Sequence, residues 1–486
     1  MTNPIPAISG SALAALRDLL GPKGFTDDPD LLAPWLTDWR GRFHGQARAL
    51  LSPADTTQVA AVLRIAGEYR VPLVPQGGNT SMVGGATPPE DGSALILSLR
   101  RMNRIRSLSS DDGVAVAEAG VILANLHEAA NAIGMRFPLT LGGKGSATVG
   151  GLVSTNAGGT QVLRFGTMRA LTLGIEAVLP DGTIFAGLDP LKKDNRGYDI
   201  RHLLIGAEGT LGIVTAASLR LVPAIVDRAV GWIGVESPHQ ALALLRQLEA
   251  RAADALEGFE IVRADSLALV LKHVPGARAP LAGDHPWHVL VEIDRSDSQA
   301  ESPTTLLENL LADALEASLF RDATIAASEA QAEAFWTLRD SLSAAERAHG
   351  PAVQHDISVP VAGMPDFMID AAAAAEARFP GVSATAFGHL GDGNVHFHVR
   401  APAGSPPDWA MGAGKAISAY VHDLVVAAGG SISAEHGIGQ MKRDENARLA
   451  DPARLTALRA IKAALDPGNL MNPGKLVPLA TGAAAP

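Results

Sequence analysis

Residues 75–85 read PQGGNTSMVGG and follow the short apolar segment VPLVP at residues 71–75. Before them, residues 55–69 carry apolar side chains at helical spacing behind polar capping residues. A helix, a strand and a glycine-rich turn in this order are typical of an α/β unit. Such a turn presents free backbone N–H groups that suit phosphate oxygens, although most turns of two glycines are purely structural.

Three further segments are rich in small residues or turn formers. They are GGKGSATVGGLVSTNAGG at 142–159, IGAEGTLGIVT at 205–215 and LDPGNLMNPGK at 465–475. Small residues let a flat ligand lie against the main chain. Two common nucleotide motifs are excluded, because Lys144 is not followed by Ser or Thr and no strand leads into a G-x-G-x-x-G turn with a later acid.

The bulk properties limit the function. The chain has 486 residues, which predicts about two to four domains, and its net charge of −11 argues against nucleic acid as a partner. With 0 cysteines it cannot form disulfides, iron–sulfur clusters or thiolate nucleophiles. The N-terminal residues lack a positively charged leader, and no stretch reaches the roughly 18 apolar residues of a membrane span. We therefore expect a cytoplasmic protein with no membrane span.

Residues 387–398, FGHLGDGNVHFH, predict a hairpin that turns at Gly-Asp-Gly. Alternation then places His396 and His398 on one face of the second strand, with His389 across the turn. Residues 433–439, SAEHGIG, add a carboxylate and an imidazole. Two histidines and a carboxylate suit a divalent metal with open coordination positions. From the residues alone, a metal or catalytic site and structural histidines are about equally good explanations.

Residues 329–347 predict one long helix, capped by Ser328. Arg339 and Ser343 then lie on the same helical face. Most arginines on a helix are simply solvated, so this pattern alone is weak evidence for a carboxylate-binding site.

The four glycine-containing segments, in this order and spacing, resemble the FAD-binding segments of the vanillyl-alcohol oxidase/p-cresol methylhydroxylase superfamily. GHLGDGNVH and AEHGIG resemble the metal-site segments of its D-2-hydroxyglutarate and D-lactate dehydrogenase branch. The resemblance implies an α+β fold: a two-part FAD-binding domain of the p-cresol methylhydroxylase type, an α/β substrate (cap) domain and a C-terminal return segment. The expected boundaries are 1–224, 225–455 and 456–486, with the active site where the domains meet.

The same resemblance implies non-covalent FAD, because Asn79 stands where a histidine could anchor the flavin. The residues implied to hold the pyrophosphate are Gln76, Gly77, Gly78, Asn79, Thr80 and Ser81. Those implied to line the isoalloxazine and ribityl chain are Gly142, Gly143, Gly145, Ser146, Thr148, Gly150, Gly151, Ser154, Asn156, Gly158 and Gly159. Those implied along the adenosine are Glu208, Gly209, Gly212 and Ile213, while Asn472 returns near the flavin.

For the chemistry, the resemblance implies His389, His396 and Glu435 as metal ligands and His436 as general base. Zinc is the first expectation, and manganese or ferrous iron would also fit. The residues implied to bind substrate are Arg339, Ser343, Gln354, Asn394 and His398. Gln354 replaces a lysine, and His398 an asparagine, of the hydroxyglutarate-specific pattern, which opens the site to a hydroxy acid with a smaller or neutral tail.

The resemblance implies an FAD- and metal-dependent dehydrogenase that oxidises a D-2-hydroxy acid, of the D-2-hydroxyglutarate type, to the 2-keto acid. D-lactate or glycolate dehydrogenation, also within a larger electron-transfer complex, is the main alternative. A direct oxidase and a flavin-free metallohydrolase are further ones. Expected partners are an electron-transfer flavoprotein, a quinone or a cytochrome as acceptor, and a second copy in a homodimer.

Overall fold

The computed structural model describes residues 8–191 and 193–478. These residues form two compact units. Unit 1 contains residues up to 159, residues 165–224 and the segment from 436 onward, and unit 2 contains residues 160–164 and 225–435. The chain thus passes from unit 1 to unit 2 after Ala224 and returns to unit 1 at His436.

Unit 1 combines two main sheets with a two-stranded pair, β7–β11, among the residues described. The first sheet has the order β1-β2-β4-β3, and the second, antiparallel sheet has the order β5-β6-β10-β8-β9. The strands are β1 (Phe25–Thr26), β2 (Leu50–Leu51), β3 (Leu73–Pro75), β4 (Leu95–Leu97), β5 (Ile105–Ser109), β6 (Val114–Glu118), β7 (Met135–Arg136), β8 (Thr172–Val178), β9 (Ile184–Gly187), β10 (Ile213–Arg220) and β11 (Val222–Pro223). The helices are α1 (Gly10–Gly24), α2 (Pro29–Leu32), α3 (Thr56–Tyr69), α4 (Leu123–Asn131), α5 (Val149–Thr155), α7 (Met168–Leu171), α8 (Ile200–Leu204), α16 (Arg443–Leu449) and α17 (Pro452–Leu465), while α6 (Val162–Phe165) lies at the crossing.

The helix and strand expected before the first glycine turn are confirmed. The side chain of Asp55 accepts the N–H of Gln58 and caps α3, whose buried face includes Val59, Val62 and Leu63. Strand β3 follows and pairs in parallel with β4. The turn at residues 76–81 therefore leaves the carboxyl end of a buried strand.

Unit 2 is built on one antiparallel sheet, whose strand order among the described residues is β15-β12-β14-β13-β17-β18-β16. Its strands are β12 (Asp227–Val235), β13 (Leu256–Arg263), β14 (Trp287–Arg295), β15 (Asp322–Ile325), β16 (Ala352–Ser358), β17 (Ser383–His389) and β18 (Asn394–Arg400). Its helices are α9 (Pro238–Ala252), α10 (Ala264–His273), α11 (Pro303–Glu316), α12 (Glu329–Asp340), α13 (Leu342–His349), α14 (Met364–Arg378) and α15 (Trp409–Ala427).

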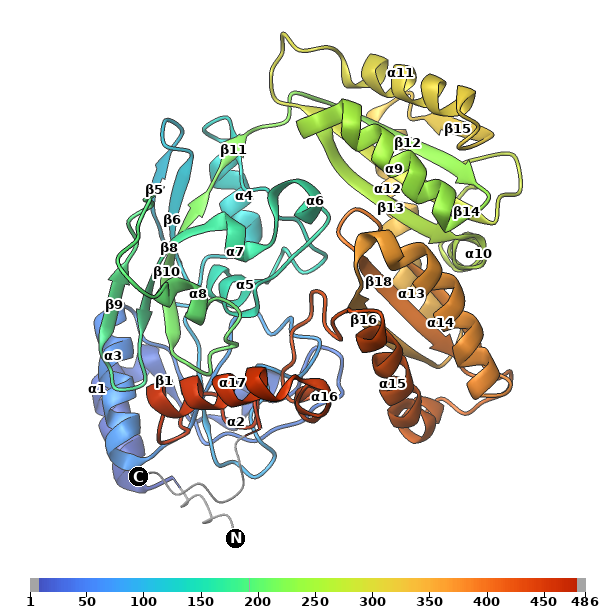
Figure 1. Ribbon diagram of the computed structural model, residues 1–486. Coiled ribbons are helices and arrows are strands. Elements are labelled where there is room, and N and C mark those ends of the chain that lie inside the picture. The colour runs from blue at the N-terminus through green and yellow to red at the C-terminus, as the bar shows by residue number, and fades with distance from the viewer. Residues whose placement is uncertain (1–7, 192, 479–486) are drawn as a thin grey trace. The chain divides into compact units, whose positions relative to one another are not determined.

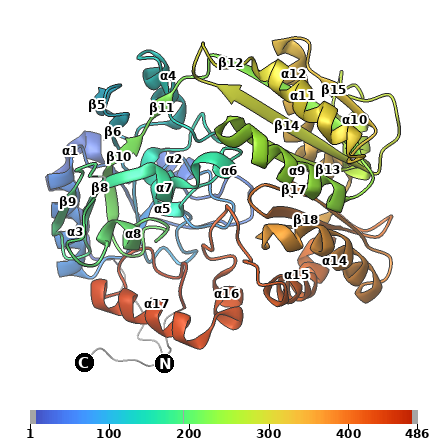
Figure 2. The same cartoon turned by 45° about the horizontal axis from the view of Figure 1, so that its top comes forward.

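Helices cover both faces of this sheet. Helices α9, α11, α14 and α15 cover an apolar face that includes Val395, Phe397 and Val399, and both views show α14 and α15 beside β18 (Figures 1 and 2). Helices α10, α12 and α13 pack on the opposite face, where His396 and His398 point because successive strand residues alternate. The predicted hairpin and its alternation are confirmed.

The prediction of one continuous helix over 329–347 is wrong. It is divided at Ser341 into α12 and α13, so Arg339 and Ser343 belong to different helices. The short polar side chains of Asp340 and Ser341 favour such a break, because they compete for the helix backbone. Ser328 caps α12 as predicted.

No helix in the two described stretches is long and apolar enough to cross a membrane.

Candidate functional site

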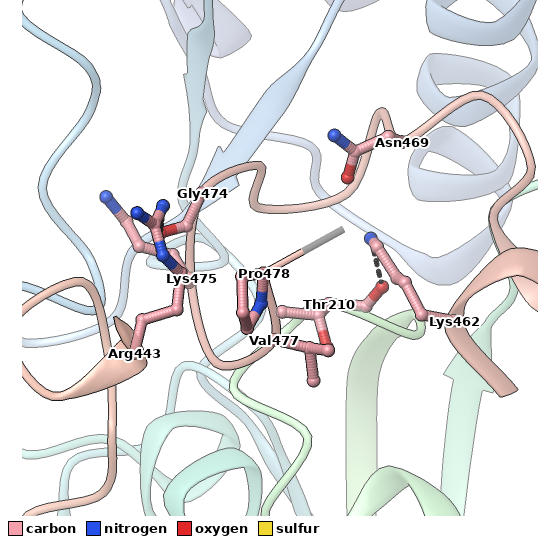
Figure 3. A pocket seen from close by; sticks show the side chains of 8 residues that line it. All are labelled: Thr210, Arg443, Lys462, Asn469, Gly474, Lys475, Val477 and Pro478. Carbon is pink, nitrogen blue, oxygen red and sulfur yellow. Dashed lines mark hydrogen bonds between the residues drawn. The ribbon is translucent and has the colours of Figure 1, made fainter. Parts of the chain in front are cut away.

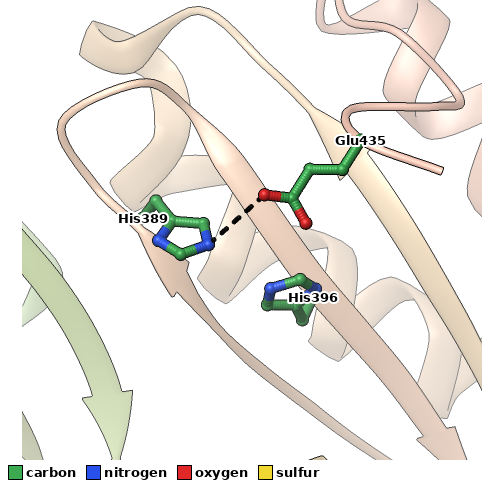
Figure 4. A group of neighbouring side chains, drawn as sticks. All are labelled: His389, His396 and Glu435. Atoms are coloured by element: carbon green, nitrogen blue, oxygen red, sulfur yellow. Dashed lines mark ion pairs between the residues drawn. The ribbon is translucent and has the colours of Figure 1, made fainter. Parts of the chain in front are cut away.

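The three expected metal ligands of unit 2 lie together. His389 ends β17, His396 lies on β18, and Glu435 comes from the loop after α15 (Figure 4). One ligand atom from each lies within 4.8 Å of the others, and His389 Nε2 is 3.7 Å from Glu435 Oε1. Two imidazoles and one carboxylate at this separation can share a divalent cation.

A buried acid orients the first of these histidines. Glu260, on β13, is 1% exposed, and its Oε1 lies 2.5 Å from His389 Nδ1. Its other oxygen accepts a 2.8 Å hydrogen bond from Arg339 Nε. A carboxylate on one imidazole nitrogen fixes the ring and leaves the other nitrogen for a metal. The sequence prediction missed Glu260, although an acid within the apolar strand LEGFEIVR was a usable signal.

A second acid positions Glu435. Asp356, on β16, accepts the backbone N–H of Glu435 at 3.0 Å and the amide of Asn394 at 2.9 Å. The ladder places Asp356 directly opposite His396, and a bridge from Ser358 to Ser431 holds the loop that carries Glu435. Asn394, expected to bind substrate, is itself buried and uses its amide nitrogen within the fold.

Burial and neighbouring charges shift the pKa values of all three ligands. Burial lowers the pKa of His389, but Glu260 outweighs it and raises the value to about 9. The pKa of His396 lies well below its ordinary range because of burial and the charges of Arg339 and His389. Burial raises the pKa of Glu435 to about 7. A divalent cation at this point would favour the deprotonated form of each group, so its binding would release protons.

Arg339 lies beside this cluster. Its side chain is 11% exposed, and Nη2 lies 3.1 Å from His389 Nε2. Glu260 holds the Nε side, which leaves the outer edge of the fork for an anionic ligand. A cation and Nη2 would compete for His389 Nε2, so metal binding requires Nη2 to turn away. Ser343 is half-buried on α13, beyond the helix break.

The two departures from the hydroxyglutarate pattern face each other. Gln354 pairs with His398 in the ladder between β16 and β18. His398 is buried 4.0 Å from Glu346, and Glu346 makes a two-pronged ion pair with Arg400. Among the described residues, none is a hydrogen-bond partner for the buried Gln354 Nε2. This part of the sheet therefore offers a neutral donor.

In unit 1, the first two glycine segments lie against each other. A Cβ at Gly78 would fall far inside van der Waals contact with Ser146 O, and one at Gly77 would overlap Thr148 Oγ1. Thr148 also caps α5, which contains Gly150, Gly151 and Ser154. The third and fourth segments join them, because Asn472 Nδ2 donates to Gly85 O at 2.9 Å and to Glu208 O at 2.7 Å.

The side chains around the first turn fit a polar ligand. The amide nitrogens of Gln76, Asn79 and Asn472 are bound to backbone carbonyls, whereas their buried amide oxygens have no hydrogen-bond partner among the described residues. Such acceptors suit the hydroxyl and N–H groups of FAD. The remaining predicted residues form the same segments, namely Thr80, Ser81, Gly142, Gly143, Gly145, Asn156, Gly158, Gly159, Gly209, Gly212 and Ile213.

A buried lysine connects the C-terminal segment of unit 1 to the rest of that unit. Lys462 Nζ donates to Thr210 O, Asp466 Oδ2 and Met471 O. Beside it lies a cavity of about 190 Å³ (Figure 3). It is lined by Thr210, Arg443, Lys462, Asn469, Gly474, Lys475, Val477 and Pro478, and none of these is a predicted site residue. His436 is the first residue of this return and follows Glu435 directly.

The comparisons with known proteins agree with this arrangement. Residues 47–186 match a family described as FAD binding domain, and residues 226–476 match FAD linked oxidases, C-terminal domain. The D-2-hydroxyglutarate dehydrogenases of Arabidopsis thaliana and Bos taurus are 35% and 36% identical to the chain, over 98% of it and 83% and 85% of their own lengths. Both are named mitochondrial, which does not match the cytoplasmic location expected above.

Among solved structures, p-cresol methylhydroxylase has the same fold, with a TM-score of 0.72 at 15% identity over 96% of each chain. The predicted fold class is confirmed.

Proposed function

The chain belongs to the FAD-linked oxidases, in the branch of the D-2-hydroxyglutarate dehydrogenases, and we propose that it oxidises a D-2-hydroxy acid to the 2-keto acid. The observation that carries this proposal is the group of His389, His396 and Glu435 beside Arg339. That group combines a cation site with a fork for a carboxylate, which are the two features that recognise a 2-hydroxy acid.

Unit 1 would hold FAD without a covalent link, between the glycine segments and the amide oxygens of Gln76, Asn79 and Asn472. When bound, FAD supplies the acceptor for the hydride that leaves the substrate Cα. The chain's own contribution is to orient the cofactor and to exclude competing reactions.

The metal, zinc in first place and otherwise manganese or ferrous iron, would be held by His389, His396 and Glu435. When bound, it supplies a Lewis acid that lowers the pKa of the substrate hydroxyl. Arg339 would bind the α-carboxylate and so orient the Cα–H bond of the substrate. His436 accepts the hydroxyl proton, a task that suits an imidazole near neutral pH.

The sheet face of unit 2 that carries Gln354 and His398 would determine which substrate tail is accepted. Arg400, a cation on the same face, is already paired with Glu346 and Asp265. Gln354 offers an N–H donor but no charge. This observation favours a second candidate within the same reaction, a D-2-hydroxy acid with a short or neutral tail such as D-lactate, or glycolate. We propose an electron-transfer flavoprotein, a quinone or a cytochrome as electron acceptor, and a homodimer as the assembly.

The test is anaerobic reduction of the bound flavin by a panel of D- and L-2-hydroxy acids, before and after chelation. Bleaching by D-isomers that a chelator suppresses is the expected result, and the fastest substrate identifies the tail. Yellow, metal-loaded protein that no hydroxy acid bleaches would contradict the proposed reaction. Colourless protein with hydrolase activity would favour a flavin-free metallohydrolase.

A further inference from the structure

Glu208, which the sequence suggested for the adenosine side of FAD, has a carboxylate that binds the backbone of a distant segment of unit 1. It is 8% exposed and has a left-handed backbone, with φ of 51°. Its Oε1 accepts the backbone N–H of Ile438 at 2.7 Å, and its Oε2 accepts that of Gly439 at 2.7 Å. Both oxygens are therefore engaged with the segment that directly follows His436.

That segment is also held through its backbone carbonyls. Ile438 O accepts the N–H of Lys442 and Gly439 O accepts that of Leu476, each at 3.0 Å. Residues 436–439 belong to no helix or strand. Gly437 has φ of 79°, and a Cβ there would lie 2.8 Å from Glu208 Oε1, so the carboxylate packs directly against the turn. Beyond the turn, the N–H groups of Gln440 and Met441 point to Val83 O, each at 3.2 Å.

Glu208 is itself anchored on both sides. Its backbone N–H donates to Ser154 O at 2.8 Å, and its carbonyl accepts Asn472 Nδ2. Burial raises the pKa of Glu208, while the N–H groups of Ile438 and Gly439 and the charges of Lys475 and Lys442 oppose that rise. Glu208 thus connects the segments of Ser154 and Asn472 to the turn at residues 437–439.

We propose that Glu208 is the positioning residue for His436: its carboxylate fixes the Gly437–Gly439 turn and so the direction of the imidazole. This inference rests on the proposed role of His436 as general base. Proton transfer depends on placement within a fraction of an ångström, because misplacement of about 1 Å costs about a hundredfold in rate. The two N–H groups that Glu208 accepts lie two and three residues after His436, so the carboxylate acts on the turn that follows the imidazole.

The test is Glu208→Gln in FAD- and metal-loaded protein, measured as single-turnover flavin reduction. The amide keeps the shape but can accept only one of the two N–H groups and sets a donor against the other. We expect the limiting rate of reduction to fall about tenfold to a hundredfold, with the substrate dissociation constant and the FAD content unchanged. If Glu208→Gln does not retain FAD, Glu208→Asp, which keeps the charge but is too short to reach both donors, is measured instead.

Asp38→Asn is the matched control. Asp38 is also buried in unit 1, and its carboxylate accepts the backbone N–H groups of Arg42 and Phe43, each at 2.6 Å, and that of Arg40 at 3.3 Å. We expect this variant to reduce its flavin at the unaltered rate.

A double-mutant cycle with His436→Ala distinguishes a failure of the positioning role of Glu208 from a failure of the proposed base role of His436. If Glu208 acts through His436, its substitution has no further effect once His436 is alanine. An equal loss in both backgrounds, or a normal rate in Glu208→Gln alone, would overturn the inference and leave the proposed function intact. Rapid reduction in His436→Ala alone would instead remove the role of His436 itself.

Discussion

The ion pair between Glu260 and His389 makes the pH dependence of metal binding predictable. With the pKa of His389 at about 9, the imidazole carries a proton at pH 7.5, and a metal must displace it. That competition weakens binding about 30-fold at pH 7.5, since each pKa unit is a factor of ten. The affinity should therefore rise by about one order of magnitude per pH unit from 7.5 to 9 and then level off.

Glu260→Gln should change both the rise of metal affinity between pH 7.5 and 9 and the plateau above pH 9. Without the carboxylate, burial dominates and the pKa of His389 falls below its ordinary value, so the rise between pH 7.5 and 9 disappears. Above pH 9 the imidazole is neutral in both proteins, and only the lost orientation remains. The loss of an orienting partner of this kind costs about 10–100-fold in metal affinity, so the variant should be weaker by that factor there.

The assay is competition with a chromophoric chelator for zinc and manganese across this pH range. Glu292→Gln is the matched control, because Glu292 is also buried on this sheet and bound to an arginine, Arg228. The control should keep the wild-type slope. A Glu260→Gln curve with the same slope and the same plateau as wild type would refute the reasoning.

Three further outcomes are expected. His436→Ala should retain FAD and slow flavin reduction by at least about a hundredfold, the usual contribution of a general base; rapid reduction in stopped-flow measurements would contradict its role. Gln354→Lys should raise kcat/KM for D-2-hydroxyglutarate relative to D-lactate by about tenfold, because it adds a charge-assisted hydrogen bond; an unchanged ratio would place the tail elsewhere. Gly78→Ala should lower the free energy of unfolding by about 1–3 kcal/mol and weaken FAD binding, because its Cβ meets Ser146 O. The control Gly67→Ala, in an open position on α3, should stabilise by about 0.5–1 kcal/mol in thermal melts.

The sequence predicts local features of the site well. The hairpin that carries His389 and His396 follows from a period of two and a Gly-Asp-Gly turn, both of which act within a dozen residues. The partners of these residues are not local. Glu260 lies 129 residues before His389, and Asp356 lies 79 residues before Glu435. Such contacts depend on the order of strands in the sheet, which periodicity does not determine.

The helix break at Ser341 is a second feature that periodicity in the sequence does not determine. The sequence predicts one helix over 329–347, whereas the structure divides it at Ser341 into α12 and α13. Helical periodicity describes the buried face of each half but does not report where one helix ends and the next begins. The substrate role of Ser343 consequently stays a prediction.

The discontinuity of unit 1 has a consequence for how the protein is made. Asn472 Nδ2 binds Gly85 O across 387 residues of chain, with all of unit 2 between them in the sequence. At about 5–20 residues per second, a ribosome needs roughly 20–80 s to add the partner after the first loop has emerged. Throughout that interval the flavin-binding loops lack the hydrogen bonds of Asn472. FAD should therefore bind after the polypeptide is complete, and a nascent chain halted before residue 472 should not retain FAD.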